Sequence, residues 1–383
     1  MTESINSADC VVVGGGLLGL LTARRLAQEG MAVTLLERGA LCRESSWAGG
    51  GILSPLVPWQ YTDAISRLVE RSQHDYPLLM AELLEQSGID PEWTQSGMLM
   101  LDTVPDTRVT AWAERFHCRL ETLDADRVQL AEPALTAASG PAVLLPGVAQ
   151  IRNPRLCQAL AVALQMQGVT IREQCTVTRL LIRDQVVNGV ETEAGPVHAN
   201  CVVIAGGAWS AQLLQGMGRE LPVKPVRGQM ILFQAPPGML RHIVQGAGHY
   251  LIPRRDGLVL AGSTLEHVGF SNETTSQARE ELMQAAFSIA PGLADYPVIR
   301  HWAGLRPGSP EGIPFIGEHS EISGLYLNTG HFRNGVVMAP ASAELLVDGL
   351  QRRDSFTDPA PYAFWPGRGL SGAGVDTAPE SGI

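Results

Sequence analysis

A glycine-rich turn near the amino terminus constrains the fold more than any other feature of the sequence. The apolar run Cys10–Val13 predicts a β-strand, and the turn GGGLLG at 14–19 follows it without a spacer. Leu17–Glu29 then has the apolar spacing of a helix, and Met31–Leu36 predicts a second strand that ends at Glu37. This order of strand, glycine turn, helix, strand and acid predicts a parallel dinucleotide-binding unit.

The glycines of this turn have separable physical roles. Gly14 permits a tight turn, Gly16 lets a pyrophosphate approach the backbone, and Gly19 lets the helix pack closely on the strand. The free N–H groups at the start of the helix favour phosphate, and Glu37 can accept hydrogen bonds from adenosine ribose hydroxyls. The alternative is a glycine-rich turn with no ligand, against which the flanking strands and the acid argue.

The composition of the 383-residue chain excludes several classes of protein. Hydrophobic residues make up 45% of the sequence, which is enough for a packed core and excludes bulk disorder. The formal net charge is −11 and the basic residues do not cluster, so we expect no nucleic-acid partner. The length predicts about two to three domains.

Neither a membrane span nor a secretory signal is expected. The most apolar stretch, 10–23, is too short to cross a bilayer, and residues 1–9 contain no basic residue. The cysteines, at positions 10, 42, 118, 157, 175 and 201, are scattered and form no CxxC pair. We therefore expect neither a disulfide framework nor a zinc or other metal site, and we expect a reducing cytoplasm as the location.

The rest of the chain alternates between helical and strand patterns. Helices are expected at 62–87, with a kink at Pro77, and at 107–117, 153–168, 276–289 and 335–350. Strands are expected at 97–102, 169–205, 223–234, 250–252, 258–261, 301–308 and 325–329, those from 223 to 261 in an antiparallel sheet. The triplet Gly49–Gly51 suits a backbone that lies against a ligand, or else a flexible surface loop.

Several stretches together carry a family resemblance. They are VVVGGGLLGLLTARRLAQEG, ESSWAGGGIL, IRNPRL, CVVIAGGAWS, PVKPVRGQMI, HYLIPRRDG, HWAGLRPGSPEGIPFIG and GHFRNGVVMAPASAELL. On these motifs the chain resembles the FAD-dependent amine oxidases of the D-amino-acid-oxidase-like group. The resemblance implies an α/β fold: a discontinuous Rossmann-like FAD-binding domain (1–90, 145–222, 309–365) and a substrate domain on a mixed, largely antiparallel sheet (91–144, 223–308). Residues 366–383 are expected to be a disordered tail.

The resemblance also implies which residues contact FAD. Leu17 and Leu18 match the pyrophosphate turn, and Glu37 and Arg38 match the adenosine site, where the backbone of Val177 would hold the adenine. The contacts would continue onto Glu44 and Ser45 and then onto Gly49, Gly50 and Gly51 under the flavin ring. The second flavin-binding stretch would be His331, Phe332, Arg333, Asn334, Gly335, Val336 and Val337. No cysteine follows Cys201, so we expect FAD to be held noncovalently.

Oxidation of an amino acid requires that its carboxylate be held, which is a task for arginine. By the resemblance we assign the carboxylate to Arg306, with the Tyr250 hydroxyl beside it and Arg333 at the substrate and flavin. Without the resemblance, Arg306 would more simply tie down a loop, Tyr250 would be a half-buried sheet residue, and Arg333 would be a solvated residue at a helix start. No strong general base is expected, because the cofactor supplies the chemistry.

The activity implied is oxidative deamination of glycine, and of sarcosine or small D-amino acids, with O2 as the electron acceptor and H2O2 as a product. Family members serve the synthesis of the thiamine thiazole ring, and a homotetramer is implied in the same way. The alternatives are a D-amino-acid or secondary-amine oxidase, a related dehydrogenase, and a flavin-binding subunit without activity. The space around the substrate Cα decides among amines, and the sequence does not measure that space.

Overall fold

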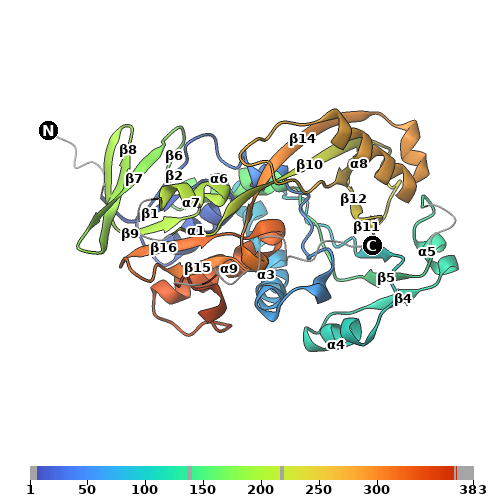
Figure 1. Ribbon diagram of the computed structural model, residues 1–383, viewed down its shortest axis with the longest axis horizontal. Helices are drawn as coiled ribbons and strands as arrows, with labels where there is room; N and C mark the ends of the chain where they lie inside the picture. Colours follow the sequence, from blue (N-terminus) through green and yellow to red (C-terminus); the bar gives the residue numbers. More distant parts are fainter. Residues whose placement is uncertain (1–6, 136–139, 216–219, 366–367, 369–383) are drawn as a thin grey trace.

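In the part of the chain that the structure describes, two sheets of eight strands each organise the fold. The computed structural model describes residues 7–135, 140–215, 220–365 and 368, and the predicted disordered tail lies almost wholly outside them. Figure 1 shows the first sheet at the left, the second at the right, and a group of helices between and below them. The expected α/β fold with a second, largely antiparallel sheet is confirmed.

The first sheet is mostly parallel, as the glycine turn predicts. Its main path runs β15-β16-β9-β1-β2-β6, and every neighbouring pair along it is parallel except β15 with β16. A hairpin of β7 and β8 extends from β9. The strands are β1 (Ser7–Val13), β2 (Val33–Leu36), β6 (Thr170–Arg172), β7 (Val177–Arg183), β8 (Val186–Thr192), β9 (Gly195–Ile204), β15 (Phe315–Glu318) and β16 (Leu325–Thr329).

Four helices pack into one apolar core against this sheet. They are α1 (Leu17–Gln28), α3 (Asp63–Ser87), α6 (Asn153–Met166) and α9 (Gly335–Leu350). Buried leucines and alanines at helical spacing give each of them an apolar face, and Gly88 ends α3 in the left-handed conformation, as expected. The short helices α2 (Ser45–Ala48) and α7 (Ser210–Leu213) lie at the carboxyl ends of this layer.

The second sheet is antiparallel at all its pairings but one. Its order is β14-β10-β13-β12-β11-β3-β5-β4, and only β11 and β3 run parallel. The strands are β3 (Met98–Leu101), β4 (Glu121–Leu123), β5 (Ala142–Leu145), β10 (Lys224–Gln234), β11 (Ile243–Gly246), β12 (His249–Pro253), β13 (Leu258–Gly262) and β14 (Val298–Gly308). Helix α8 (Ser276–Ile289) packs on it, and α4 (Thr107–Arg115) and α5 (Ala125–Ala131) join its outer strands.

The chain passes back and forth between the two sheets. Strands of the first sheet come from 7–36, 170–204 and 315–329, and strands of the second come from 98–145 and 224–308. This interleaving has the same order as the predicted domain ranges, whose boundaries stay a prediction. Among the described residues, no helix is both long and apolar enough to cross a bilayer.

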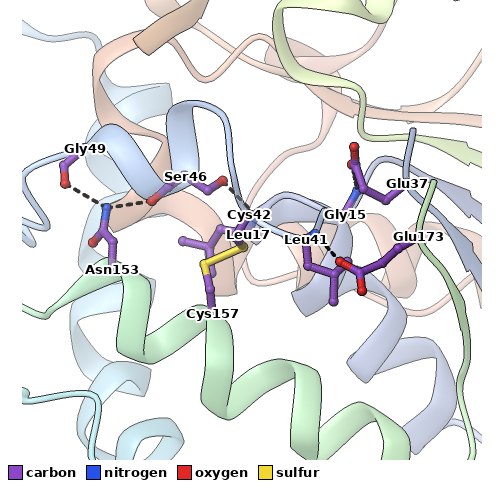
Figure 2. The surroundings of a disulfide bond; sticks show 10 residues. All are labelled: Gly15, Leu17, Glu37, Leu41, Cys42, Ser46, Gly49, Asn153, Cys157 and Glu173. Atoms are coloured by element: carbon purple, nitrogen blue, oxygen red, sulfur yellow. Dashed lines mark hydrogen bonds between the residues drawn. A yellow bond between two sulfur atoms is a disulfide. The ribbon is translucent and has the colours of Figure 1, made fainter. Parts of the chain in front are cut away.

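One expectation from the cysteines is wrong. Cys42 and Cys157 form a disulfide, although they are 115 residues apart, with 6.2 Å between their Cα atoms. The spacing of the cysteines does not reveal this pair, because the two residues meet only when α6 packs against the loop that follows β2 (Figure 2). The cysteine pattern therefore does not by itself indicate a reducing compartment. The described residues contain no group of three or more His, Cys, Asp or Glu that could hold a metal ion.

Candidate active site

A cavity of about 360 Å³ opens at the carboxyl ends of the parallel strands. Its wall includes Val177 and Trp209 as well as Arg306 and Arg333. The predicted site residues in its wall are Gly14, Gly16, Leu17, Leu18, Glu37, Arg38, Glu44, Ser45, Gly49, Val177, Arg306, His331, Phe332, Arg333, Gly335 and Val336. Residues drawn from distant parts of the sequence thus share one wall.

The remaining predicted site residues are not part of this wall. They are Gly19, Gly50, Gly51, Tyr250, Asn334 and Val337, none of which lines the cavity. A side chain at Gly19 would overlap the carbonyl oxygen of Gly14, so the close packing of α1 on the turn requires glycine there. A Cβ on Gly50 would lie 3.5 Å from the Tyr250 ring, which puts this glycine between the cavity wall and the second sheet.

The amino terminus of α1 faces the cavity, and its N-cap residue, Gly16, has no side chain to cap it. Gly14 has a φ of +114°, which favours glycine, and a Cβ there would lie 2.5 Å from the Ala205 carbonyl oxygen. The first N–H groups of a helix lack partners within the helix. Here the Leu17 N–H donates to Ser46 Oγ at 2.8 Å, which ties the turn to α2. Such an exposed helix terminus attracts anions.

Glu37 lies at the end of β2 and organises the opposite side of the turn. Its Oε2 accepts a hydrogen bond from the Gly15 N–H at 2.7 Å, and its Oε1 accepts one from the Gly39 N–H at 2.8 Å. Nearby, the Arg38 guanidinium stacks 3.8 Å above the Trp209 ring. The carboxylate is thus fixed in the cavity wall with acceptor capacity left for hydroxyl groups.

The structure brings Arg306, Tyr250 and Arg333 together. Arg306 is half-buried because part of its surface faces the cavity, and its Nη2 and Nη1 donate to Ser263 Oγ (2.7 Å) and the Thr264 carbonyl (3.1 Å). Desolvation lowers the pKa of Arg306, the Arg333 charge lowers it further, and Tyr250 opposes the shift. Among the described residues, no carboxylate forms an ion pair with Arg306 or Arg333.

Glycines of the second sheet make room for these side chains. Tyr250 on β12 pairs with Gly262 on β13, and a Cβ at Gly262 would lie 2.9 Å from the phenol oxygen. A Cβ at Gly228 on β10 would overlap the Arg306 guanidinium. No side chain therefore projects from these two positions of the sheet, and the phenol and the guanidinium occupy that space. Sequence analysis missed Gly228 because the pairing of β10 with β14 is needed to place it.

Two side chains of α3 hold the first turn of α9, where a proline interrupts the hydrogen bonds of the helix. Pro340 inside α9 has no N–H, which leaves the Val336 carbonyl without its helical donor. The Tyr76 hydroxyl donates to this oxygen at 2.5 Å, and Ser72 Oγ accepts the next N–H, that of Ala341, at 3.1 Å. Burial raises the pKa of Tyr76 well above its usual range, so the phenol stays a donor. The helix terminus at the cavity is thereby fixed.

His331 is a neutral part of the cavity wall. Only 1% of the residue is exposed, its Nε2 lies 3.0 Å from Ser342 Oγ, and burial lowers the pKa of His331 to about 3. A histidine with this pKa is uncharged at neutral pH, and its ring is already engaged by a hydroxyl. His249 does not line the cavity.

Arg254 joins the Gly49–Gly51 loop to the second sheet. It follows β12, is 9% exposed, and donates to the Gly50 carbonyl (2.7 Å), the Ile151 carbonyl (2.9 Å) and Gln150 Oε1 (2.8 Å). Burial lowers the pKa of Arg254 to about 10, which leaves it charged at neutral pH. The glycine triplet is therefore a fixed loop and not a flexible one.

Several wall residues were not predicted. They include Cys42, Arg43, Ser46, Trp209, Gln212, Pro307, Asn328 and Thr329. The stretches ESSWAGGGIL and CVVIAGGAWS contained a usable signal, because polar or aromatic residues flank glycines there. The unpredicted wall residues outside these two stretches are placed by tertiary packing alone.

Comparison with known proteins agrees with this geometry. Residues 9–349 match the family model described as FAD dependent oxidoreductase. The chain belongs to this family. It is similar to a glycine oxidase of Pseudomonas aeruginosa, with 48% identity over 92% of this chain and 97% of that protein. It is 31% identical, over 91% of this chain and 53% of the relative, to the bifunctional protein ThiO/ThiG of Trichormus variabilis. The crystal structure of glycine oxidase from Geobacillus kaustophilus superposes with a TM-score of 0.88 at 28% identity, covering 94% of this chain and 99% of that one.

The residues of the cavity fit FAD, the cofactor of this family. Four arginines but only two glutamates line the cavity, although the whole chain carries a net charge of −11. A diphosphate needs such a positive environment and the open amino terminus of a helix, which α1 supplies. Glu37 suits ribose hydroxyls, and the amino terminus of α9 with Arg333 suits the negative charge of a reduced flavin.

Proposed function

We propose that this protein is a glycine oxidase that converts glycine to glyoxylate and ammonia and produces H2O2 from O2. The observation that carries the proposal is the pair of arginines in the wall of the FAD cavity. Arg306 is half-buried, and within the described residues it forms no ion pair with a carboxylate. A guanidinium in this state gains most from an anionic ligand, and an amino-acid carboxylate matches its planar fork.

The side chains of the site would hold the substrate and leave the redox step to the cofactor. Arg306 binds the carboxylate by two parallel hydrogen bonds, and Tyr250 donates its hydroxyl to the same group. FAD, when bound, would supply the hydride acceptor and the route of the electrons to O2. Arg333 and the amino terminus of α9 would stabilise the negative charge of a reduced flavin. The neutral imidazole of His331 completes the wall and takes no proton.

A peroxide assay of the purified protein with glycine, sarcosine and D-alanine tests the proposal. We expect turnover of glycine, and bleaching of the flavin absorbance when glycine is added without O2. Turnover of sarcosine or D-alanine alone would replace glycine as the substrate, and bleaching without peroxide would indicate a dehydrogenase. No bleaching by any of the three amines would leave only a flavin-binding role.

The Arg306→Ala variant tests the carboxylate assignment. It should bind FAD as the wild type does and show a strongly raised KM for glycine, because the anchoring cation is gone. An unchanged KM would contradict the assignment.

The remaining parts of the proposal rest on the relatives and on the sequence. The similarity to ThiO/ThiG proteins supports a role in the synthesis of the thiamine thiazole. A noncovalent FAD, a homotetramer and a cytoplasmic location stay predictions. Absorbance after acid precipitation, the mass in solution and cell fractionation measure them in turn.

A further inference from the structure

The disulfide lies in the wall of the FAD cavity. Cys42 lines the cavity and Cys157 lies behind it on α6 (Figure 2). Cys157 follows Asn153 by four residues, so the two side chains leave the same face of the helix. The Asn153 amide donates to the carbonyls of Ser46 (2.9 Å) and Gly49 (3.1 Å). One face of α6 is therefore attached twice to the wall segment 42–49, once by the amide and once covalently.

The same wall segment holds the pyrophosphate turn. The Cys42 N–H donates to the Gly15 carbonyl at 2.9 Å, and Ser46 Oγ accepts the Leu17 N–H at 2.8 Å. The chain of contacts thus runs from the glycine turn through Cys42 to α6. A shift of Cys42 would move the turn that faces the phosphates.

Cys42 also has a backbone conformation that needs support. Its φ is +53°, in the left-handed region that residues other than glycine rarely adopt. The disulfide is one of the contacts that hold it there. When the bond is reduced, this contact is lost and the residue is freer to relax, with the wall around it.

We propose that Cys42 and Cys157 are a reversible oxidation site that sets how tightly the protein holds FAD. In the disulfide form the wall is fixed and FAD is retained, and in the dithiol form FAD is released more readily. Both residues are nearly inaccessible from the outer surface, at 4% and 6% exposed. Cys42 faces the cavity, which is the side from which a small reagent reaches the pair.

The chemistry requires an oxidant of the peroxide class. A thiolate of the pair attacks H2O2 and gives a sulfenic acid and water; the second thiol displaces a second water and closes the S–S bond. The two thiols lose two electrons and the peroxide gains them. A dithiol reductant reverses the step. That the enzyme's own product is the oxidant rests on the proposed function, but the site itself does not.

The other cysteines provide internal comparisons. The sulfur atoms of Cys10 and Cys201 lie 3.0 Å apart on adjacent strands, but neither residue lines the cavity. Cys175 lines the cavity near Val177 and is free, so its oxidation is the rival cause of any effect of peroxide on FAD. The variant Cys157→Ser separates the two, because it breaks the disulfide from outside the cavity and keeps Cys175.

The test compares holoenzyme treated with dithiothreitol and with added H2O2, followed by removal of each reagent. Denaturing alkylation and mass analysis count the thiols, and the fluorescence of released FAD on dilution gives the dissociation constant. Oxidised wild type should have two fewer thiols and a Cys42–Cys157 peptide. If, after reduction, the wall is in its FAD-binding conformation about a tenth of the time, the dissociation constant for FAD rises about tenfold. Cys157→Ser should match reduced wild type under both treatments, and Cys118→Ser should match wild type.

Three outcomes would overturn the proposal. They are no loss of the two thiols with peroxide, equal FAD affinity of oxidised and reduced wild type, and a peroxide effect that persists in Cys157→Ser. Reduced wild type gives the answer without any variant, should Cys157→Ser fail to fold. Because the oxidant is added and the readout is FAD fluorescence, the result is independent of which amine the protein oxidises.

Discussion

Replacing Gly228 by alanine should weaken substrate binding while leaving the protein folded. The Arg306 guanidinium occupies the place of a Cβ at Gly228, so the added methyl group must displace it. The φ of Gly228 is not positive, so alanine is compatible with the backbone of β10. The atoms that must move are the far end of a flexible side chain, and the sheet itself stays intact.

The magnitude follows from the hydrogen bonds that orient Arg306. Displacement breaks its contacts with Ser263 Oγ at 2.7 Å and with the Thr264 carbonyl at 3.1 Å, and the fork no longer meets a carboxylate. A hydrogen bond to a charged group contributes about 1.5–3 kcal/mol. Loss of one hydrogen bond between Arg306 and the substrate carboxylate therefore lowers kcat/KM about 10- to 150-fold, mainly through KM.

The assay is steady-state oxidation of glycine, with FAD content from absorbance and the melting temperature measured alongside. Gly147→Ala is the matched control, because a Cβ there meets no atom within 4 Å. It should leave KM unchanged. A folded, FAD-replete Gly228→Ala protein with the wild-type KM would refute the reasoning, since Arg306 could then not be the anchor.

Three further changes test other parts of the site. Tyr76→Phe removes the donor to the Val336 carbonyl and should lower the free energy of unfolding by about 1–3 kcal/mol in urea titrations. Folding lowers the pKa of His331 from 6.5 to about 3, so the unfolded chain binds the extra proton; stability should fall from pH 6.5 towards 3 by up to about 1.4 kcal/mol per pH unit. His331→Gln should reduce that slope in urea titrations at each pH. Arg254→Lys keeps the charge but not the fork at Gly50, and kcat should fall about tenfold at unchanged FAD content in the steady-state assay.

Local signals were enough to predict most of the framework. The bounds of α8 (Ser276–Ile289) and α9 (Gly335–Leu350) match the expected ranges, because apolar spacing and capping residues are local properties. The parallel core around the turn 14–19 was predictable for the same reason. The short strands β4, β11 and β15 were missed, since three or four residues carry too little periodicity to be recognised.

The contacts that shape the site depend on tertiary packing. Cys42 and Cys157 are joined only because α6 backs the loop after β2, and scattered cysteines give no sign of this. Gly228 appears in the sequence as an ordinary strand glycine until β14 places Arg306 across it. Sequence motifs identify which residues face the cofactor. Tertiary packing decides which other residues hold those cofactor-facing residues in position.

Pro340 shows how a local sequence signal and tertiary packing act together at the cavity. The sequence places a proline inside a predicted helix, so the missing N–H at Pro340 and the freed carbonyl of Val336 are predictable from the chain alone. The donor that replaces it is not predictable, because Tyr76 is 260 residues distant in sequence. Since burial keeps that phenol protonated, the carbonyl retains its partner at every working pH. The turn of α9 that follows Arg333 is thereby fixed from α3, so a variant of Tyr76 should weaken FAD binding as well as folding.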